Sequence, residues 1–399
     1  MITEERNAYV IELCKNLIQH QSYSGQEKDV MNYIRQVFEQ LGYDKVYCDD
    51  FGNVIGEIRG NYPGPNLLFD GHVDTVPVDQ EKWDIDPFSG EVTQNKIYGR
   101  GASDMKGAVS AMISSASYFA KDLDKNFAGN LYVACGVHEE CFEGVASRKI
   151  SQLIKPDYVV IGESTNLNVN RGQRGRAEIV IETFGKRSHS SNPEKGLNAV
   201  YQMTDIIQKI KQSENKKHDV LGLGLLELTD IKSSPYPGAS VVPDYCRVTY
   251  DRRLLVGETK ESVLRPIQEA INQLHCAKDN IKISYALGSE VCYTGEVIKE
   301  ERFFPGWIID DNDPFVQGVI NGLREIGIHS NIGHYSFCTN GSHYAGEAGI
   351  KTIGFGPSYE ALAHIDNEYI EIDQLHGAMK GYYSIMKSVL QLNIKVDQS

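Results

Sequence analysis

The sequence predicts an α/β protein in which a domain built on a central mixed sheet is divided in two by an inserted α+β domain. Four short apolar runs, each bounded by glycine or charge, indicate central strands that are covered on both faces. They lie at residues 66–69, 131–137, 158–161 and 352–355. A helix-compatible stretch at 107–119 separates the first two runs and gives the β-α-β order of an α/β domain.

The middle of the chain has a different pattern. Segments 177–182, 246–251 and 281–285 alternate apolar and polar residues, which is typical of an antiparallel sheet with one solvated face. Two stretches with apolar residues at helical spacing, at 199–210 and 263–274, are interleaved with these segments. We therefore expect a first α/β part at 1–175, an inserted domain at 176–288 and a second α/β part at 289–399.

Two amphipathic helices precede the first of these strands. Apolar residues recur at helical spacing over 10–18 and again over 30–41. The second helix is expected to begin at a capping box formed by Ser24 and Glu27 and to end at Gly42.

The length and composition indicate how many domains to expect and argue against nucleic acids and membranes as partners. The 399 residues are more than one hydrophobic core usually supports, so two domains are the expectation. A net charge of −14 argues against a nucleic-acid partner, which needs clustered Lys and Arg. No apolar run approaches the roughly 20 residues needed to span a bilayer. Residues 1–6 lack the pattern of a signal peptide, so we expect a cytoplasmic protein with no membrane partner.

The eight cysteines are scattered along the chain without a Cys-x-x-Cys pair. In a chain of this size without a secretion signal, such scattering indicates reduced thiols that are mostly buried. Any metal ion is therefore expected to bind nitrogen and oxygen ligands.

Histidine and acidic residues follow three of the predicted strands. His72 and Asp74 follow the first strand, Glu139 and Glu140 the second, and Glu163 the third. In open α/β sheets, ligands bind beyond the carboxyl ends of the strands. Each group also has a structural interpretation, such as a core histidine beside a turn aspartate, or a solvated acidic loop.

Two further candidates lie at similar places. Asp104 precedes the predicted helix at 107–119, where it could also be a helix cap, and His364 follows the run at 352–355. Two histidines and three carboxylates suit two divalent ions that share one bridging carboxylate. Zn²⁺ is the first candidate, with Co²⁺ and Mn²⁺ as alternatives. A further carboxylate could then carry the proton of an activated water.

Three motifs carry a resemblance to a known family. They are Gly-His-Val-Asp-Thr-Val-Pro at 71–77, Gly-Arg-Gly-Ala-Ser-Asp-Met-Lys-Gly at 99–107 and His-Glu-Glu at 138–140. With Glu163, segment 185–193 and His364, they resemble the superfamily of acetylornithine deacetylase, succinyl-diaminopimelate desuccinylase and carboxypeptidase G. The motifs follow in order over essentially the whole chain. Within the superfamily, the chain most resembles the selenium-metabolism-linked hydrolases.

The resemblance implies a ligand set for two metal ions. It makes Asp104 the bridging ligand. His72 and Glu163 would complete one site, and Glu140 and His364 the other.

The resemblance also implies the reaction and the residues that carry it. Glu139 would be the general base and acid, and Asp74 would orient His72. The substrate would be a small N-acyl amino acid or a dipeptide-like molecule, whose amide bond is hydrolysed.

The inserted domain is implied to be a ferredoxin-like lid that also forms a homodimer. Its His189 would reach the partner's active site, and Arg252 would bind the carboxylate of the substrate. Arg253 is an immediate rival, which faces the opposite side of an alternating strand. Asn340 is a predicted substrate contact from loop 338–343, where the chain departs from the Gly-Gly-Thr-Asp-like turn of the family.

Two other functions are alternatives to this hydrolase. A non-catalytic metal- or ligand-binding relative could lose Glu139 at little cost, whereas this chain retains it beside a complete ligand set. A thiol hydrolase based on Cys141 would need a recognisable Cys/His setting, which the sequence does not show.

Overall fold

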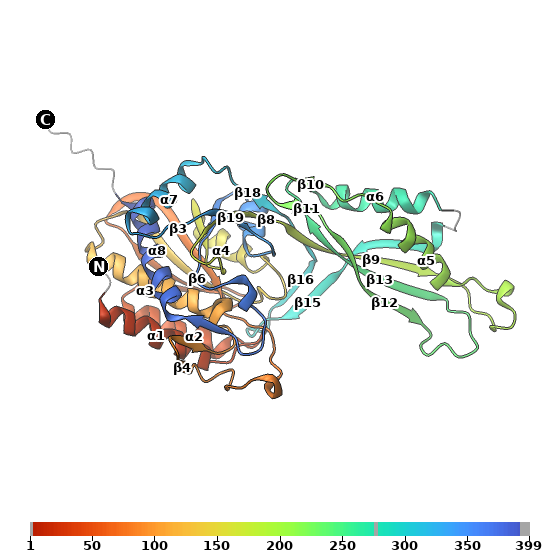
Figure 1. Ribbon diagram of the computed structural model, residues 1–399, viewed down its shortest axis with the longest axis horizontal. Helices are drawn as coiled ribbons and strands as arrows, with labels where there is room; N and C mark the ends of the chain where they lie inside the picture. The colour runs from red at the N-terminus through yellow and green to blue at the C-terminus, as the bar shows by residue number, and fades with distance from the viewer. Residues whose placement is uncertain (1–2, 275–277, 392–399) are drawn as a thin grey trace. The chain divides into compact units, whose positions relative to one another are not determined.

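The computed structural model describes residues 3–274 and 278–391, and the chain forms two compact units (Figure 1). Unit 1 comprises Met1–Gln173, Ser289–Ile298 and Ile308–Ser399, and unit 2 comprises Arg174–Gly288 and Lys299–Trp307. Two boundaries between the units, after Gln173 and after Gly288, lie beside the boundaries expected near 175 and 288. The chain also enters unit 2 a second time over Lys299–Trp307, which the sequence pattern did not indicate.

Unit 1 is built on a nine-stranded mixed sheet in the order β1-β2-β6-β3-β7-β20-β8-β18, with β19 beside β8. The strands are β1 (Lys45–Cys48), β2 (Val54–Arg59), β3 (Tyr62–His72), β6 (Ala128–Gly136), β7 (Tyr158–Ile161), β8 (Val169–Gln173), β18 (Trp307–Ile308), β19 (Ile332–Tyr335) and β20 (Lys351–Gly354). The central strands β6, β3, β7 and β20 run parallel to one another. Strand β2 is antiparallel to both of its neighbours, β6 and β1. A separate small sheet is formed by β4 (Val92–Thr93), β5 (Lys96–Tyr98) and β21 (Tyr369–Glu371).

Helices cover both faces of the central sheet, as the unbroken apolar runs predict. They are α1 (Glu4–Gln19), α2 (Lys28–Leu41), α3 (Gly107–Asp122), α4 (Ser147–Ile154), α7 (Pro314–Glu325) and α8 (Ile372–Leu390). On β3, Phe69 packs edge-to-face on Tyr382 of α8, with ring centroids 5.3 Å apart. The preceding residue, Leu68, points to the other face and packs in a buried cluster with Ile150 and Ile154 of α4.

The four predicted strands form at the predicted places, as β3, β6, β7 and β20. The predicted helix at 107–119 forms as α3. The predicted capping box is wrong: α2 begins at Lys28, Glu27 makes no side-chain cap bond, and the hydroxyl of Ser24 donates to Asp74 instead. The end of α2 is as predicted, with Gly42 in the left-handed conformation (φ 82°).

Unit 2 has the ferredoxin-like topology that was expected. Its elements are β9 (Gly175–Phe184), α5 (Ala199–Lys211), β12 (Leu226–Ser234), β13 (Tyr245–Leu254), α6 (Lys260–Asn272) and β14 (Ile281–Tyr285). This β-α-β-β-α-β chain pairs its strands in the order β12-β13-β9-β14, and β17 (Phe303–Phe304) also pairs with β9. Every pairing in this sheet is antiparallel.

One face of the sheet in unit 2 is buried under α5 and α6. Ile179 and Ile181 of β9 lie in one cluster with Met203 and Ile206 of α5 and with Ile267 of α6. The alternate residues of β9 and β13 are partly exposed, as the alternating sequence pattern predicts.

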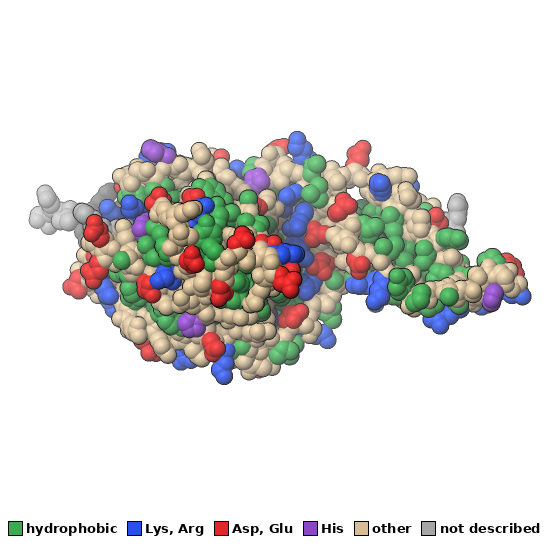
Figure 2. Space-filling model, turned by 60° about the horizontal axis from the view of Figure 1, so that its bottom comes forward, with side chains coloured by type: hydrophobic (Ala, Val, Ile, Leu, Met, Phe, Trp, Pro, Cys, Tyr) green, Lys and Arg blue, Asp and Glu red, His purple; other side chains and the backbone are tan. Residues whose placement is uncertain are grey.

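Short strand pairs lie outside the larger sheets. They are formed by β10 (Lys217–His218) with β11 (Gly222–Leu223) and by β15 (Leu287–Val291) with β16 (Val297–Glu301). On the surface, acidic and basic side chains are interspersed over the visible face (Figure 2). Among the described residues, no helix is long and apolar enough to cross a membrane.

Candidate metal centre

The predicted ligands of unit 1 meet at one edge of the central sheet. In the parallel register, His72 of β3 lies opposite Gly136 of β6, and Asp70 lies opposite Ile161 of β7. The carboxyl ends of these three strands therefore coincide, and the residues that follow them share one edge. This geometry explains why residues far apart in sequence converge.

The structure groups five of the predicted residues into two sets of donor atoms. His72, Asp104 and Glu163 form one set, and Asp104, Glu140 and His364 form the other; in each set the donor atoms lie within 4.8 Å of one another. Asp104 belongs to both sets. Imidazole nitrogens and carboxylate oxygens are ligands that fit Zn²⁺ and similar divalent cations.

The two oxygens of Asp104 face different histidines. Oδ1 lies 3.0 Å from His72 Nε2, and Oδ2 lies 3.1 Å from His364 Nε2. Glu163 Oε1 lies 3.3 Å from His72 Nε2, and Glu140 Oε2 lies 2.9 Å from His364 Nε2. Asp104 thus has the geometry of a carboxylate shared between two sites.

The ring of His72 is held by the segment that follows it. Nδ1 lies 2.9 Å from the carbonyl oxygen of Asp74 and 3.6 Å from its Oδ1, so the second nitrogen, Nε2, faces the donor group. The carboxylate of Asp74 mainly bonds elsewhere: it accepts the backbone N–H groups of Glu139 and Glu140 and the hydroxyl of Ser24. Asp74 therefore joins the histidine ligand to the Glu139–Glu140 turn.

Glu139 lies beside the donor groups and is 6% exposed. Its Oε2 is 3.8 Å from His72 Nε2, and its Oε1 has no hydrogen-bond partner among the described residues. Burial raises the pKa of Glu139 well above the usual range, and the neighbouring Glu163 and Glu140 raise it further. A buried carboxyl with an unbonded oxygen is suited to carry a proton.

The charges of the cluster are unbalanced in favour of anions. Burial and the nearby Asp104 raise the pKa of Glu140 to about 7 and also raise that of Glu163. Asp104 and Glu140 together raise the pKa of His364 to about 10. Burial opposes ionisation of Asp104, but hydrogen bonds from His364 and His72 outweigh it and hold its pKa well below the usual range. Such crowding of carboxylates is relieved by bound cations.

The other predicted site residues have local partners of their own. In unit 2, His189 is exposed, and its Nδ1 lies 2.7 Å from Ser191 Oγ. In unit 1, the amide of Asn340 is bonded at both ends: Nδ2 donates to Asp70 at 2.8 Å, and Oδ1 accepts the backbone N–H of Gly144 at 2.9 Å. Asn340 therefore ties the loop after Glu140 to β3.

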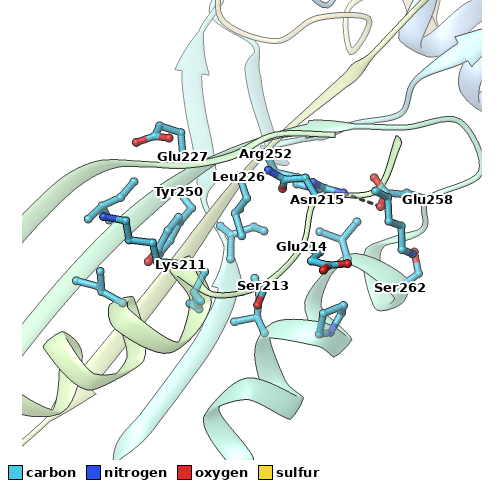
Figure 3. A pocket seen from close by; sticks show the side chains of 18 of the residues that line it. Lys211, Ser213, Glu214, Asn215, Leu226, Glu227, Tyr250, Arg252, Glu258 and Ser262 are labelled. Atoms are coloured by element: carbon cyan, nitrogen blue, oxygen red, sulfur yellow. Dashed lines mark hydrogen bonds and ion pairs between the residues drawn. The ribbon is translucent and has the colours of Figure 1, made fainter. Parts of the chain in front are cut away.

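Arg252 lies on the helix-covered face of the sheet in unit 2. Its guanidinium is 2.7 Å from Glu258, and both residues line a cavity of about 460 Å³ with Leu226 and Tyr250 (Figure 3). Arg253 points to the opposite face, is more exposed, and pairs with Asp251 at 3.0 Å. The sequence pattern predicts that Arg252 and Arg253 point to opposite faces of β13, but it does not predict that Arg252 pairs with Glu258.

Two residues around the centre were missed by the sequence interpretation. Ser24 was assigned to a helix cap, although its hydroxyl bonds Asp74 at 2.7 Å. Glu368 is fully buried and accepts the backbone N–H of Asp104 at 3.0 Å. A signal was present for Glu368, since it is an acidic residue close to His364 in the same loop.

A comparison with protein families matches the description "Peptidase family M20/M25/M40" over residues 68–388. The chain belongs to this family. The match spans most of the chain and includes parts of unit 1 on both sides of unit 2, together with unit 2 itself. The resemblance to the superfamily inferred from the motifs is confirmed, and the chain is a hydrolase of the M20 family rather than a protein of an unrelated class.

Two curated relatives illustrate the family. The Escherichia coli (strain K12) protein YgeY is 35% identical over 378 residues, which cover 92% of each chain. The succinyl-diaminopimelate desuccinylase of Orientia tsutsugamushi (strain Boryong) is 28% identical over 280 residues, which cover 66% of this chain and 71% of the relative.

A solved structure agrees on the fold. The Bacillus subtilis YXEP protein, described as a dinuclear metal binding peptidase from the M20 family, superposes with a TM-score of 0.72 at 14% identity. The match covers 96% of this chain and 98% of that one. At this identity the likeness shows the fold, and the predicted fold class is confirmed.

Proposed function

We propose that this M20 family member is a metal-dependent hydrolase that cleaves the amide bond of an N-acyl amino acid or a dipeptide-like substrate. The observation that carries the proposal is the position of Asp104, whose two oxygens face one histidine each within two separate donor groups. The desuccinylase among the relatives and the dinuclear metal binding peptidase among the structures support it.

The proposed ligands of the two metal ions are the residues of the donor groups. His72, Asp104 and Glu163 would hold one ion, and Asp104, Glu140 and His364 the other. Zn²⁺ suits this nitrogen and oxygen set best, with Co²⁺ and Mn²⁺ as alternatives. When bound, the pair of ions activates a water molecule and polarises the scissile carbonyl.

Glu139 is the proposed proton carrier. It takes a proton from the attacking water on its unbonded Oε1 and delivers the proton to the leaving nitrogen. Its burial supports this role, because desolvation makes the Glu139 carboxylate a stronger base than an exposed glutamate and so favours uptake of a proton. Asp74 holds both the ring of His72 and the turn that carries Glu139.

The proposed contributions of unit 2 rest on the family resemblance. His189 would stabilise the oxyanion from the partner chain of a homodimer, and its exposure is compatible with such a contact. An arginine of β13 would bind the substrate carboxylate. Arg252 was the first choice from the sequence, but its bond to Glu258 favours the more exposed Arg253. We further propose that the protein is cytoplasmic.

The first experiment is elemental analysis of protein purified without added metal, combined with hydrolysis of a panel of N-acyl amino acids and dipeptides. We expect about two Zn²⁺-like ions per chain, because each donor group should hold one ion. Chelation should abolish hydrolysis, because the proposed reaction depends on these ions. Failure to bind metal after reconstitution would overturn the ligand assignment and favour a relative without this chemistry. Metal bound without turnover would shift the search to other amide substrates.

A further inference from the structure

Glu368 is a fully buried carboxylate that belongs to neither donor group. Its Oε2 accepts hydrogen bonds from Arg100 Nη1 at 2.7 Å and from the backbone N–H of Gly101 at 3.1 Å. Its Oε1 accepts the backbone N–H groups of Ser103 at 2.7 Å and of Asp104 at 3.0 Å. Four donors from one loop thus converge on one carboxylate.

These bonds join the two segments that carry Asp104 and His364. Glu368 follows His364 in the same loop, and β21 begins immediately after it. The backbone is fixed on both sides, because Gly99 N–H donates to the carbonyl of Glu368 at 2.9 Å and Tyr369 pairs with Tyr98 of β5. The Asp104 loop is therefore held against the His364 loop by strand pairing and by the carboxylate.

We propose that Glu368 is a positioning residue that holds Asp104 opposite His364 and so sets the geometry of the Asp104–Glu140–His364 donor group. This inference rests on the proposed metal centre. Residues that orient metal ligands through hydrogen bonds typically change metal affinity about 10- to 100-fold when they are replaced. Glu368 acts on Asp104 by accepting the backbone N–H of Asp104, which fixes the position of the backbone from which the Asp104 side chain extends.

The geometry predicts an unequal effect on the two sites. Two of the three residues in the Asp104–Glu140–His364 group lie on the segments that Glu368 joins, whereas the His72–Asp104–Glu163 group has only Asp104 there. Loss of the carboxylate should therefore lower the metal affinity of the Asp104–Glu140–His364 group more than that of the His72–Asp104–Glu163 group. A role limited to general stability would lower both affinities to the same extent, or neither.

The test is a titration of metal-free, full-length protein with Zn²⁺ in competition with a chromophoric chelator. The variants are Glu368→Gln and a matched control, Glu347→Gln, which loses an ion pair with Arg148 at 2.6 Å outside the donor groups. We expect Glu368→Gln to bind one Zn²⁺ about 10- to 100-fold more weakly and the other with a smaller change. The control should bind both ions as the wild type does.

Each outcome decides the inference. Wild-type affinity at both sites in Glu368→Gln, or an equal weakening of Zn²⁺ binding at both sites, would overturn it. If Glu368→Gln does not fold, Glu368→Asp keeps the charge beside Arg100 but is too short to reach all four donors, and the same unequal loss is expected. Absence of Zn²⁺ binding by the wild-type chain would instead overturn the metal centre itself, and this inference with it.

Discussion

Asp74 Oδ1 lies 3.1 Å from the backbone nitrogen of Glu139, so the proposed proton carrier is held by a residue that follows a different strand. The second oxygen, Oδ2, accepts the N–H of Glu140 at 3.2 Å and the hydroxyl of Ser24 at 2.7 Å. The turn begins at His138 with a φ of 55°, a conformation that few non-glycine residues adopt. Asp74 thus stabilises a turn whose backbone is unusual and which carries the proposed proton carrier Glu139 and the proposed metal ligand Glu140.

Replacement of Asp74 by alanine should therefore lower turnover even when Zn²⁺ is saturating. The N–H groups of Glu139 and Glu140 lose their acceptor, and a small displacement of a catalytic group costs about 100-fold in kcat. Steady-state kinetics with Zn²⁺ in excess would measure it. Ser24→Ala is the matched control, because it removes one bond to Asp74 and leaves the turn bonded. A fall in kcat as large in Ser24→Ala as in Asp74→Ala would contradict this role.

The fold was predictable because its main signals are local. Unbroken apolar runs marked strands such as β7 that are covered on both faces, and alternation marked β13, whose second face is partly exposed. The exception is informative. Ser24 and Glu27 fit a capping box, but the hydroxyl of Ser24 bonds Asp74, a partner distant in sequence. A tertiary contact outweighed a local preference there.

The candidate site was predictable only in part, for a related reason. His72 and Glu163 could be placed together because parallel strands bring their carboxyl ends to one edge. The bond between Glu368 and Asp104 depends on how two loops meet, which no periodicity encodes. Alternation placed Arg252 and Arg253 on opposite faces, but it could not tell that Glu258 pairs with Arg252.

Glu139→Gln should retain metal and lose most turnover. The amide has the shape of the carboxyl but cannot take up the proton, and general acid–base groups typically contribute about 10²- to 10⁴-fold to the rate. Elemental analysis and kcat on the same preparation would measure both properties. Glu143→Gln is a control in the same turn that lies outside both donor groups. Turnover of Glu139→Gln within about tenfold of the wild type would remove Glu139 as the proton carrier.

The two arginines of β13 should respond differently to replacement by alanine. Arg252→Ala removes the cation that pairs with Glu258, and breaking a buried ion pair costs about 3 kcal/mol of unfolding free energy. Arg253→Ala should leave stability nearly unchanged and raise KM for a carboxylate substrate about tenfold or more. Urea unfolding and KM measured on both variants would separate the roles. A raised KM in Arg252→Ala alone would return the substrate contact to Arg252.

Mixed dimers test whether His189 acts on the partner's site. In a dimer of His189→Ala with Glu139→Gln, one of the two sites would contain both Glu139 and an intact His189 of the other chain. We expect such dimers to regain about half of the activity per dimer, because only that site is complete. Differently tagged chains, co-purified through both tags, would provide verified mixed dimers. Activity that stays at the level of the single variants would show that His189 does not act across the dimer.

The Glu347 carboxylate should contribute to stability with a defined pH dependence. Burial works to raise its pKa, but hydrogen bonds from His343 and Arg148 outweigh burial and lower the pKa from 4.5 to about 2. Because the folded-state pKa lies below the unfolded one, the contribution is fully present above about pH 4.5 and is lost as the pH falls toward about 2.

Glu347→Gln should therefore lower the unfolding free energy by about 1 kcal/mol at pH 7, and this difference should shrink as the pH falls below 4.5. Urea unfolding of the wild type and the variant between about pH 3 and pH 7 would measure it. Asp50→Asn is the control, because Asp50 is 75% exposed and lies 3.4 Å from Lys149. A difference between wild type and Glu347→Gln that stays constant over this range, or grows toward acid pH, would show that the ion pair with Arg148 does not stabilise the folded state.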